Sequence, residues 1–163
     1  MKDAIGGTFS LQIILFFLVV INAYLAFSVN YTKAFRIKNN IIAIIEQQEG
    51  YTVSSAIGGE ESAETRIFNL MKSANYTINK SDLKCNKMGN GYKTIYDDIE
   101  KAGFCLKLHK NADGSGYYTV ITQVNIDIPI VNNILPLSGI FSIKGETKSI
   151  YSNKLIPLNE LNK

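Results

Sequence analysis

The types and spacing of Cys105 and His109 suggest a nucleophilic cysteine with a histidine base. A cysteine activated by a nearby histidine base is a common nucleophile. Apolar and polar residues alternate around the pair, which predicts a strand, and four residues along a strand span about 13 Å. A proton cannot pass directly over that distance. We therefore expect His109 to lie at the surface and Cys105 to have no catalytic role.

The segment 111–116 carries oxygen-bearing side chains at alternate positions, Asn111, Asp113 and Ser115, followed by a glycine. This pattern resembles the first half of a calcium-binding loop. Such a loop has a bidentate glutamate at its twelfth position, and Thr122 occupies that position here. A hairpin turn built on Asp113 and the glycine after it explains the same residues. We expect this turn, with no metal and no cofactor.

Asp97, Asp98 and Glu100 are the remaining candidates, as paired carboxylates for acid–base chemistry. Because apolar residues stand at 95, 96 and 99, we interpret the stretch as a short helix that ends at Gly103, with its carboxylates in solvent. The sequence contains no glycine-rich phosphate loop, no zinc-ligand spacing and no catalytic triad. Its net charge of +3 is small and its lysines are scattered, so we expect no nucleic-acid partner. The sequence predicts a protein that is not an enzyme.

The two cysteines, Cys85 and Cys105, allow two interpretations. In an oxidising compartment they could form a disulfide that closes a loop of about 20 residues. In a reducing compartment they would remain free thiols. We expect the disulfide if the domain that carries them lies outside the cell.

The elements that position these residues begin with an apolar helix. Residues 4–32 contain no charged side chain, and residues 9–29 contain no proline. A bilayer core requires roughly 20 apolar residues in one helix, so we predict a transmembrane helix. A cleaved secretory signal would have a shorter apolar region and a small-x-small site, which residues 26–28 match poorly.

An amphipathic extension follows this span. Ile37, Ile41, Ile44 and Ile45 recur at helical spacing, and the first glycine after the span is Gly50. We therefore predict one helix over residues 8–49, about 60 Å long, whose second half has an apolar face that needs a partner.

Residues 50–151 are predicted to form a small domain of short helices followed by an antiparallel sheet. The predicted fold class is therefore α+β. Apolar periodicity indicates a helix near 62–75, and alternation indicates strands near 104–110, 118–128 and 139–150. Phe141 and Ile143 are expected to point inward. The tail, residues 152–163, is expected to be loosely held.

A short leader ending in glycine, an apolar helix directly after it, an amphipathic extension and a small outer domain resemble a type IV pilin-like protein. The C-terminal part is similar to the TadE/TadF-like pseudopilins of tight-adherence pili. The likeness there consists of a strand through 124–128, a proline-containing apolar connector, and a second strand from 141. The resemblance covers the first 50 residues and roughly 117–151.

This resemblance implies that a prepilin peptidase removes leader residues 1–7 by cutting after Gly7. Thr8 would then be the first residue and Gln12 the fifth, where the family usually has a glutamate. It also implies a structural minor subunit of a pilus or secretion filament in the bacterial cytoplasmic membrane. Its N-terminus would lie in the cytoplasm and its domain outside, with other pilin or pseudopilin subunits and the assembly machinery as partners.

Two sets of residues are expected to pack against neighbouring subunits. Within the membrane these are Asn22, Ala23 and Ala26, because small and polar residues allow close helix contact in lipid. Beyond the membrane they are the four isoleucines of the amphipathic extension.

Two alternatives remain open, one for the orientation and one for the function. Lys33, Arg36 and Lys38 follow the span, whereas Lys2, offset by Asp3, precedes it, so the positive-inside rule favours a cytoplasmic domain. The chain could also be a single-pass, membrane-anchored adhesin or ligand-binding module that does not polymerise.

Overall fold

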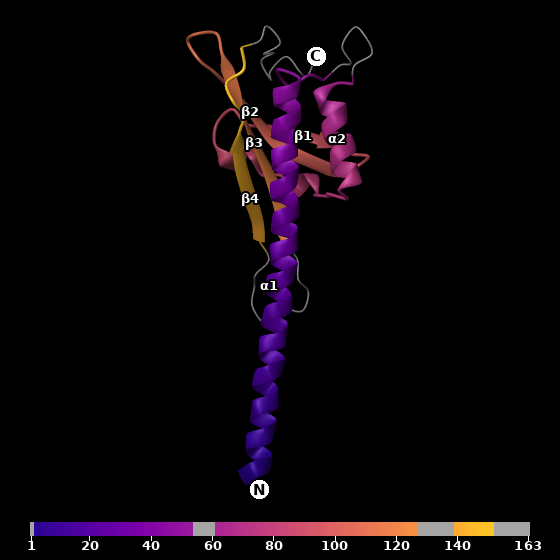
Figure 1. Cartoon of the computed structure of the whole chain (residues 1–163), viewed down its shortest axis with the longest axis vertical. Helices are drawn as coiled ribbons and strands as arrows, with labels where there is room; N and C mark the ends of the chain where they lie inside the picture. The colour runs from indigo at the N-terminus through magenta and orange to yellow at the C-terminus, as the bar shows by residue number, and fades with distance from the viewer. Residues whose placement is uncertain (1, 54–60, 127–138, 152–163) are drawn as a thin grey trace.

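The structure, a computed structural model, describes residues 2–53, 61–126 and 139–151 (Figure 1). Two α-helices come first, then two short 3-10 helices and four strands. These elements are α1 (Lys2–Gln47), α2 (Ala63–Ser73), η1 (Lys80–Asp82), η2 (Cys85–Met88), β1 (Lys93–Asp97), β2 (Ala102–Lys110), β3 (Gly116–Ile126) and β4 (Gly139–Glu146). This confirms the predicted α+β class. The expected proline-containing connector and the tail at 152–163 lie outside the described residues.

Helix α1 is one unbroken helix of 46 residues, as predicted for residues 8–49, and it also includes the expected leader from Lys2 onward. It ends where the backbone of Glu49 has a positive φ of 53°. The N–H of Gly50, at a φ of 151°, then donates to the carbonyl of Ile45 at 3.0 Å. Such a left-handed turn is a common helix stop. The first half of α1 projects away from the domain, and the second half lies against the sheet (Figure 1).

The four strands form an antiparallel sheet in the order β1-β2-β3-β4. The turn between β2 and β3 is the predicted hairpin. The N–H of Asn111 donates to the carbonyl of Ser115 at 2.8 Å. The carboxylate of Asp113 accepts from the backbone N–H of Ser115 at 3.0 Å and from its hydroxyl at 2.7 Å. Asp113 and Ser115, two of the residues considered for calcium, therefore bond each other in this turn.

Helix α1 covers one face of the sheet. It contacts β3, β4 and the antiparallel helix α2. The hydroxyl of Thr122 on β3 donates to the carbonyl of Ala34 on α1 at 3.2 Å, which fixes the face that β3 presents to the helix. Because side chains alternate along a strand, Val120 and Val124 share this face, and both are buried.

The opposite face of β3 is covered by the chain between α2 and β1. The hydroxyl of Tyr76 donates to the carbonyl of Gln123 at 2.5 Å and accepts from its N–H at 3.2 Å. This contact lies beyond the last paired residues of β2 and β3, Cys105 and Ile121. Tyr76 therefore satisfies backbone groups that a neighbouring strand would otherwise bond. The side-chain oxygen of Gln123 accepts from the N–H of Lys84 at 3.1 Å.

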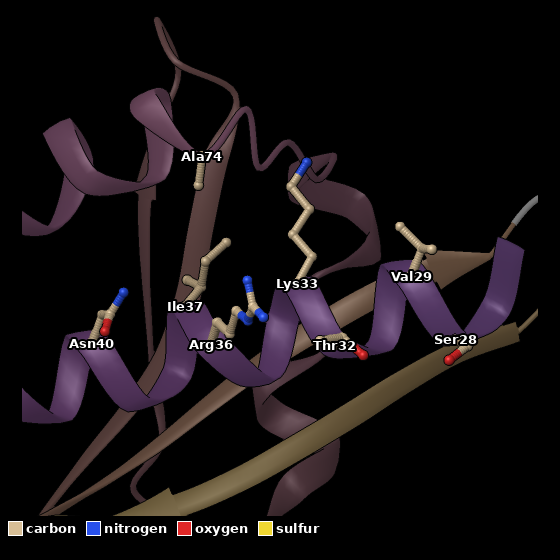
Figure 2. A pocket seen from close by; sticks show the side chains of 8 residues that line it. All are labelled: Ser28, Val29, Thr32, Lys33, Arg36, Ile37, Asn40 and Ala74. Carbon is tan, nitrogen blue, oxygen red and sulfur yellow. The ribbon is translucent and has the colours of Figure 1, made fainter. Parts of the chain in front are cut away.

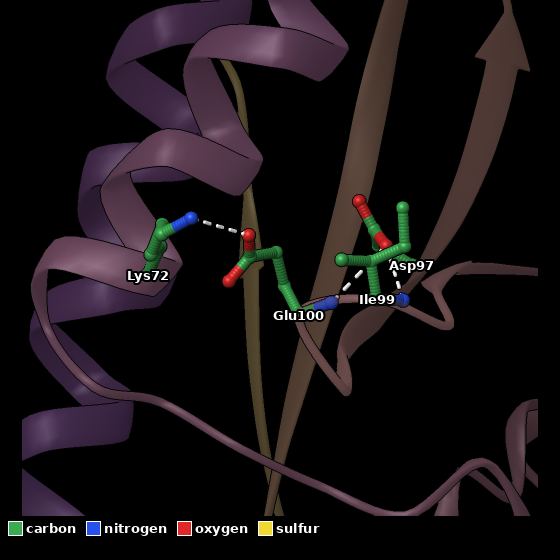
Figure 3. A network of polar contacts seen from close by, with 4 residues as sticks. All are labelled: Lys72, Asp97, Ile99 and Glu100. Carbon is green, nitrogen blue, oxygen red and sulfur yellow. Dashed lines mark hydrogen bonds and ion pairs between the residues drawn. The ribbon is translucent and has the colours of Figure 1, made fainter.

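The helix predicted around residues 95–99 is wrong. Lys93–Asp97 is strand β1, which pairs with the first half of β2. Asp97 ends the strand, and its carboxylate accepts from the N–H groups of Ile99 at 2.7 Å and Glu100 at 3.2 Å (Figure 3). This is a turn closed by an aspartate side chain.

Gly103, expected as a helix cap, lies inside β2. A Cβ on Gly103 would lie 2.7 Å from the carbonyl oxygen of Ile95, so the close pairing of β1 and β2 requires glycine at this position. Glu100, in the turn between these two strands, forms an ion pair with Lys72 of α2 at 2.7 Å (Figure 3). The acidic cluster considered for catalysis thus builds a turn and holds it to α2.

Candidate membrane and assembly surface

The first half of α1 has no cover from the described part of the domain. None of the side chains from Gly7 to Ala26 is buried, and large apolar side chains such as Phe16 are about half exposed, at 53%. This free length is about 20 residues, or about 30 Å at 1.5 Å per residue. That matches the thickness of a bilayer's hydrocarbon core. Within the described residues, α1 is the helix that is long and apolar enough to cross a membrane.

The free helix meets the domain at Phe27. Its ring lies edge to face with Phe141, near the start of β4, at a centroid distance of 5.3 Å. The ring of Tyr31, one turn further along α1, stacks on Phe27 at 6.0 Å. These aromatic contacts mark where α1 stops being bare and becomes part of the domain. Phe141, expected to point inward, is still 42% exposed at this edge.

The predicted packing residues of the span lie on the free helix. Asn22 is exposed, and its amide nitrogen donates to the carbonyl of Leu18 at 2.7 Å. In the described part of the chain, no donor is bonded to the side-chain oxygen of Asn22. Ala23 and Ala26 are half-buried and, at helical spacing, lie on the same side of α1. Whether this face contacts a neighbouring subunit stays a prediction.

The predicted role of Ile37, Ile41, Ile44 and Ile45 is wrong. All four are buried inside this chain's own core, and Ile41 and Ile45 are completely covered, at 0% exposure. The sheet and α2 are the partners that their apolar face needs. The periodicity predicted a covered face correctly, but the cover comes from the same chain. These isoleucines are therefore not available to a neighbouring subunit.

The expected processing site lies on the exposed start of α1. A Cβ at Gly7 would meet nothing within 4 Å, and Thr8 and Gln12 are both exposed. The helix runs through the bond between Gly7 and Thr8 without a break. Cleavage at this bond stays a prediction.

The structure contains the predicted disulfide. Cys85 and Cys105 are bonded, with their Cα atoms 5.5 Å apart, and both residues are buried. The bond joins η2 to β2, so it holds the segment that covers the far face of β3 against the sheet. Because the sulfur of Cys105 is in this bond, it offers no thiolate to His109.

His109 takes part in a polar row across three strands. Its Nε2 lies 3.1 Å from the hydroxyl of Thr119, which lies 3.5 Å from the carboxylate of Glu146. The ring stacks on Tyr117 at a centroid distance of 4.5 Å. Partial burial, together with the nearby Lys107, lowers the pKa of His109 below its ordinary value, which favours the neutral ring. These contacts stabilise the sheet surface and assemble no nucleophile.

A groove that the sequence analysis missed lies directly beyond the free helix (Figure 2). We call it the interfacial groove. It has a volume of about 530 Å³. Its polar lining is Ser28, Thr32, Lys33, Arg36 and Asn40. Its apolar lining is Val29, Ile37 and Ala74. The sequence signal is the recurrence of polar residues at positions 28, 32, 36 and 40, which helical spacing places along one side of α1.

In the ranges that the structure describes, no three His, Cys, Asp or Glu side chains gather as metal ligands. Comparisons of the chain with protein-family models, curated proteins and solved structures found no match.

Proposed function

We propose that this chain is a minor pseudopilin, held in the bacterial cytoplasmic membrane by α1 and incorporated into a type IV or tight-adherence-like pilus or secretion filament. One observation carries the proposal. Among the described residues, no side chain is buried along a membrane-spanning length of α1, and the same helix continues without a break into the core of a small domain. No glycine or proline lies between Thr8 and Glu49 to act as a hinge. Subunits that packed along the bare helix would therefore hold their domains in a fixed arrangement.

Asn22 supports lateral packing within the membrane. Its amide nitrogen donates to the backbone of its own helix, and its side-chain oxygen accepts no hydrogen bond from the described residues. An amide oxygen in lipid is stabilised by a donor on another helix, and the small side chains of Ala23 and Ala26 allow close approach. Filament subunits are partners that would supply such a helix.

The disulfide supports an external domain, because disulfides persist in oxidising compartments. The cations after the span favour the opposite orientation, but two of them have roles in the fold. Lys33 donates to the carbonyl of Asn75, and Lys38 is buried with its ammonium 4.3 Å from the ring centroid of Phe35. Their presence is thus explained by folding, and we propose a cytoplasmic N-terminus.

Processing by a prepilin peptidase belongs to the same proposal. Cutting after Gly7 would leave Gln12 as the fifth residue, where it could accept a hydrogen bond from a neighbour's new amino terminus but could not form an ion pair. Intact-mass measurement of protein from native membranes tests this step. A chain that retains residues 1–7 beside an active peptidase would contradict it.

A second candidate is a membrane-anchored adhesin or ligand-binding module that stays monomeric. The observation in its favour is the internal burial of the isoleucine face, because the extension then needs no neighbouring subunit. The two candidates differ only in what contacts the bare helix.

Substitutions on the two faces of α1 separate these candidates. Asn22→Leu with Ala26→Leu should reduce co-purification of other pilus subunits, because the larger side chains block close contact. The matched control is Phe17→Trp, which helical periodicity places on the opposite face. Membrane insertion and the thermal unfolding of the domain should be unchanged in both variants. Unchanged co-purification in the double variant, or wild-type protein that is always monomeric, would support the second candidate.

A further inference from the structure

We propose that the interfacial groove binds the phosphate of an anionic phospholipid from the membrane that α1 crosses. This inference rests on the membrane-anchoring part of the proposed function and is independent of filament assembly. It follows from where the groove lies, which groups line it, and how those groups are held.

The groove lies at the depth of the lipid headgroups. It starts at Ser28, directly after the free length of α1 and the contact of Phe27 with the domain. Lys33 is seven residues beyond Ala26, which is about 10 Å along the helix. Headgroups occupy about 5–8 Å on each side of the hydrocarbon core, so the backbone of Lys33 lies just beyond them and that of Arg36, about 15 Å beyond Ala26, lies further out. The groove therefore begins at the height of the lipid headgroups, and the exposed side chain of Arg36 can extend back from its outer end toward a phosphate.

The lining of the groove matches a phosphate that is attached to an apolar tail. Lys33 and Arg36 carry positive charge, and no carboxylate lines the groove. Thr32 and Ser28 add hydroxyl donors, about one and two turns nearer the membrane than Arg36, respectively. Val29 and Ile37 give an apolar wall that a free anion would not use. Figure 2 shows Val29, Lys33 and Ile37 in a row along one side of α1.

Lys33 and Arg36 both have N–H donors available for an anion. The ammonium of Lys33 donates one hydrogen bond to the carbonyl of Asn75, just after α2, and two further donors remain. Arg36 is exposed, and the ion pairs formed among the described residues do not include it. Its planar guanidinium can donate two parallel hydrogen bonds to a phosphate. One anchored cation beside one free cation is a suitable arrangement for holding a headgroup.

Native mass spectrometry of the full chain tests the proposal. The protein is extracted in mild detergent from vesicles of phosphatidylcholine and phosphatidylglycerol, and the lipids retained on the monomer are counted. We expect retention of phosphatidylglycerol over phosphatidylcholine. Lys33→Gln with Arg36→Gln should reduce that retention about ten-fold, since each cation near a membrane surface contributes to the attraction of anionic lipid.

Three controls make the test specific. Lys110→Gln with Lys148→Gln removes the same charge from the end of the domain remote from the span and should leave retention unchanged. Lys33→Arg with Arg36→Lys preserves both charges and should retain most of the lipid. Thermal unfolding of every variant shows whether the fold is intact. Equal loss in the remote variant would overturn the proposal, because the effect would then be one of net charge.

Two further outcomes would also overturn it. Displacement of the lipid by added glycerol phosphate would indicate a site for a free phosphate. A cross-link from the groove to a second protein chain, with no lipid retained, would indicate a helix as the occupant. Because lipid is counted on the monomer, these results do not depend on filament assembly, which the co-purification experiment tests separately.

Discussion

Phe27 and Phe141 lie edge to face, with ring planes 80° apart, and join α1 to the start of β4 at the point where the helix leaves the domain. Edge-to-face aromatic pairs contribute about 0.5–1.5 kcal/mol beyond the area they bury. We expect a double-mutant cycle of Phe27→Ala and Phe141→Ala to give a coupling energy in this range. The measurement is denaturant unfolding of the domain in detergent. Phe17→Ala, on the bare helix, should leave stability unchanged, and additive effects of the two substitutions would mean that the rings are not coupled.

Ile41 is predicted to be essential for folding. It is fully buried between α1 and the sheet, and truncation of such a side chain costs about 2–5 kcal/mol. Ile41→Ala should therefore lower the free energy of unfolding by that amount. Ile13→Ala removes the same atoms from the exposed span and serves as the control. If Ile41→Ala were as stable as wild type but defective in assembly, Ile41 would lie at a subunit interface.

The disulfide is predicted to stabilise the domain by about 3 kcal/mol, because it closes a loop of about 20 residues in the unfolded chain. Cys85→Ser with Cys105→Ser should lower the thermal midpoint, and reductant should do the same to the wild type but not to the variant. Thiol labelling of unreduced, denatured protein from native membranes measures the bond directly. Two reactive thiols would contradict both the bond and the external orientation.

Tyr76→Phe removes a single hydroxyl that bonds two backbone groups of Gln123. Tyr76 is buried, so the variant leaves a backbone N–H without a partner, and we expect a cost of about 1–3 kcal/mol. Tyr151→Phe is the control, since Tyr151 is exposed and its hydroxyl donates to Asp113 alone among the described residues. Equal stabilities of the two variants would show that water or a shifted strand replaces the hydroxyl.

The sequence correctly predicted the elements in which apolar residues follow one clear pattern, either an unbroken run or strict alternation. The uncharged run before Lys33 and the alternation in β2 and β3 each have one simple explanation, and both predictions agree with the structure. The residues 95–99 have spacing that suits either a helical turn or a strand followed by a turn. Residues 93–97 form a strand because they pair with β2, and the side chain of Asp97 closes the turn after it. Neither interaction can be predicted from the spacing of residues 95–99.

The candidate surface was only partly predictable for a related reason. An apolar stripe such as that of Ile37 and Ile41 shows that a face is covered, but not whether the cover belongs to the same chain. The interfacial groove depends on the fold bringing Ala74 beside Lys33 and Arg36, which are distant in sequence. The disulfide was predictable because the domain has only one pair of cysteines.

In-cell photo-crosslinking shows whether the bare half of α1 contacts other subunits, as we propose. A photoreactive residue is placed at position 22 on the proposed packing face and, as a control, at position 17 on the opposite face, with the chain expressed at its native level. We expect protein adducts at position 22, to a second copy or to other pilin-like subunits, and few at position 17. Adducts to lipid alone at both positions would contradict the claim.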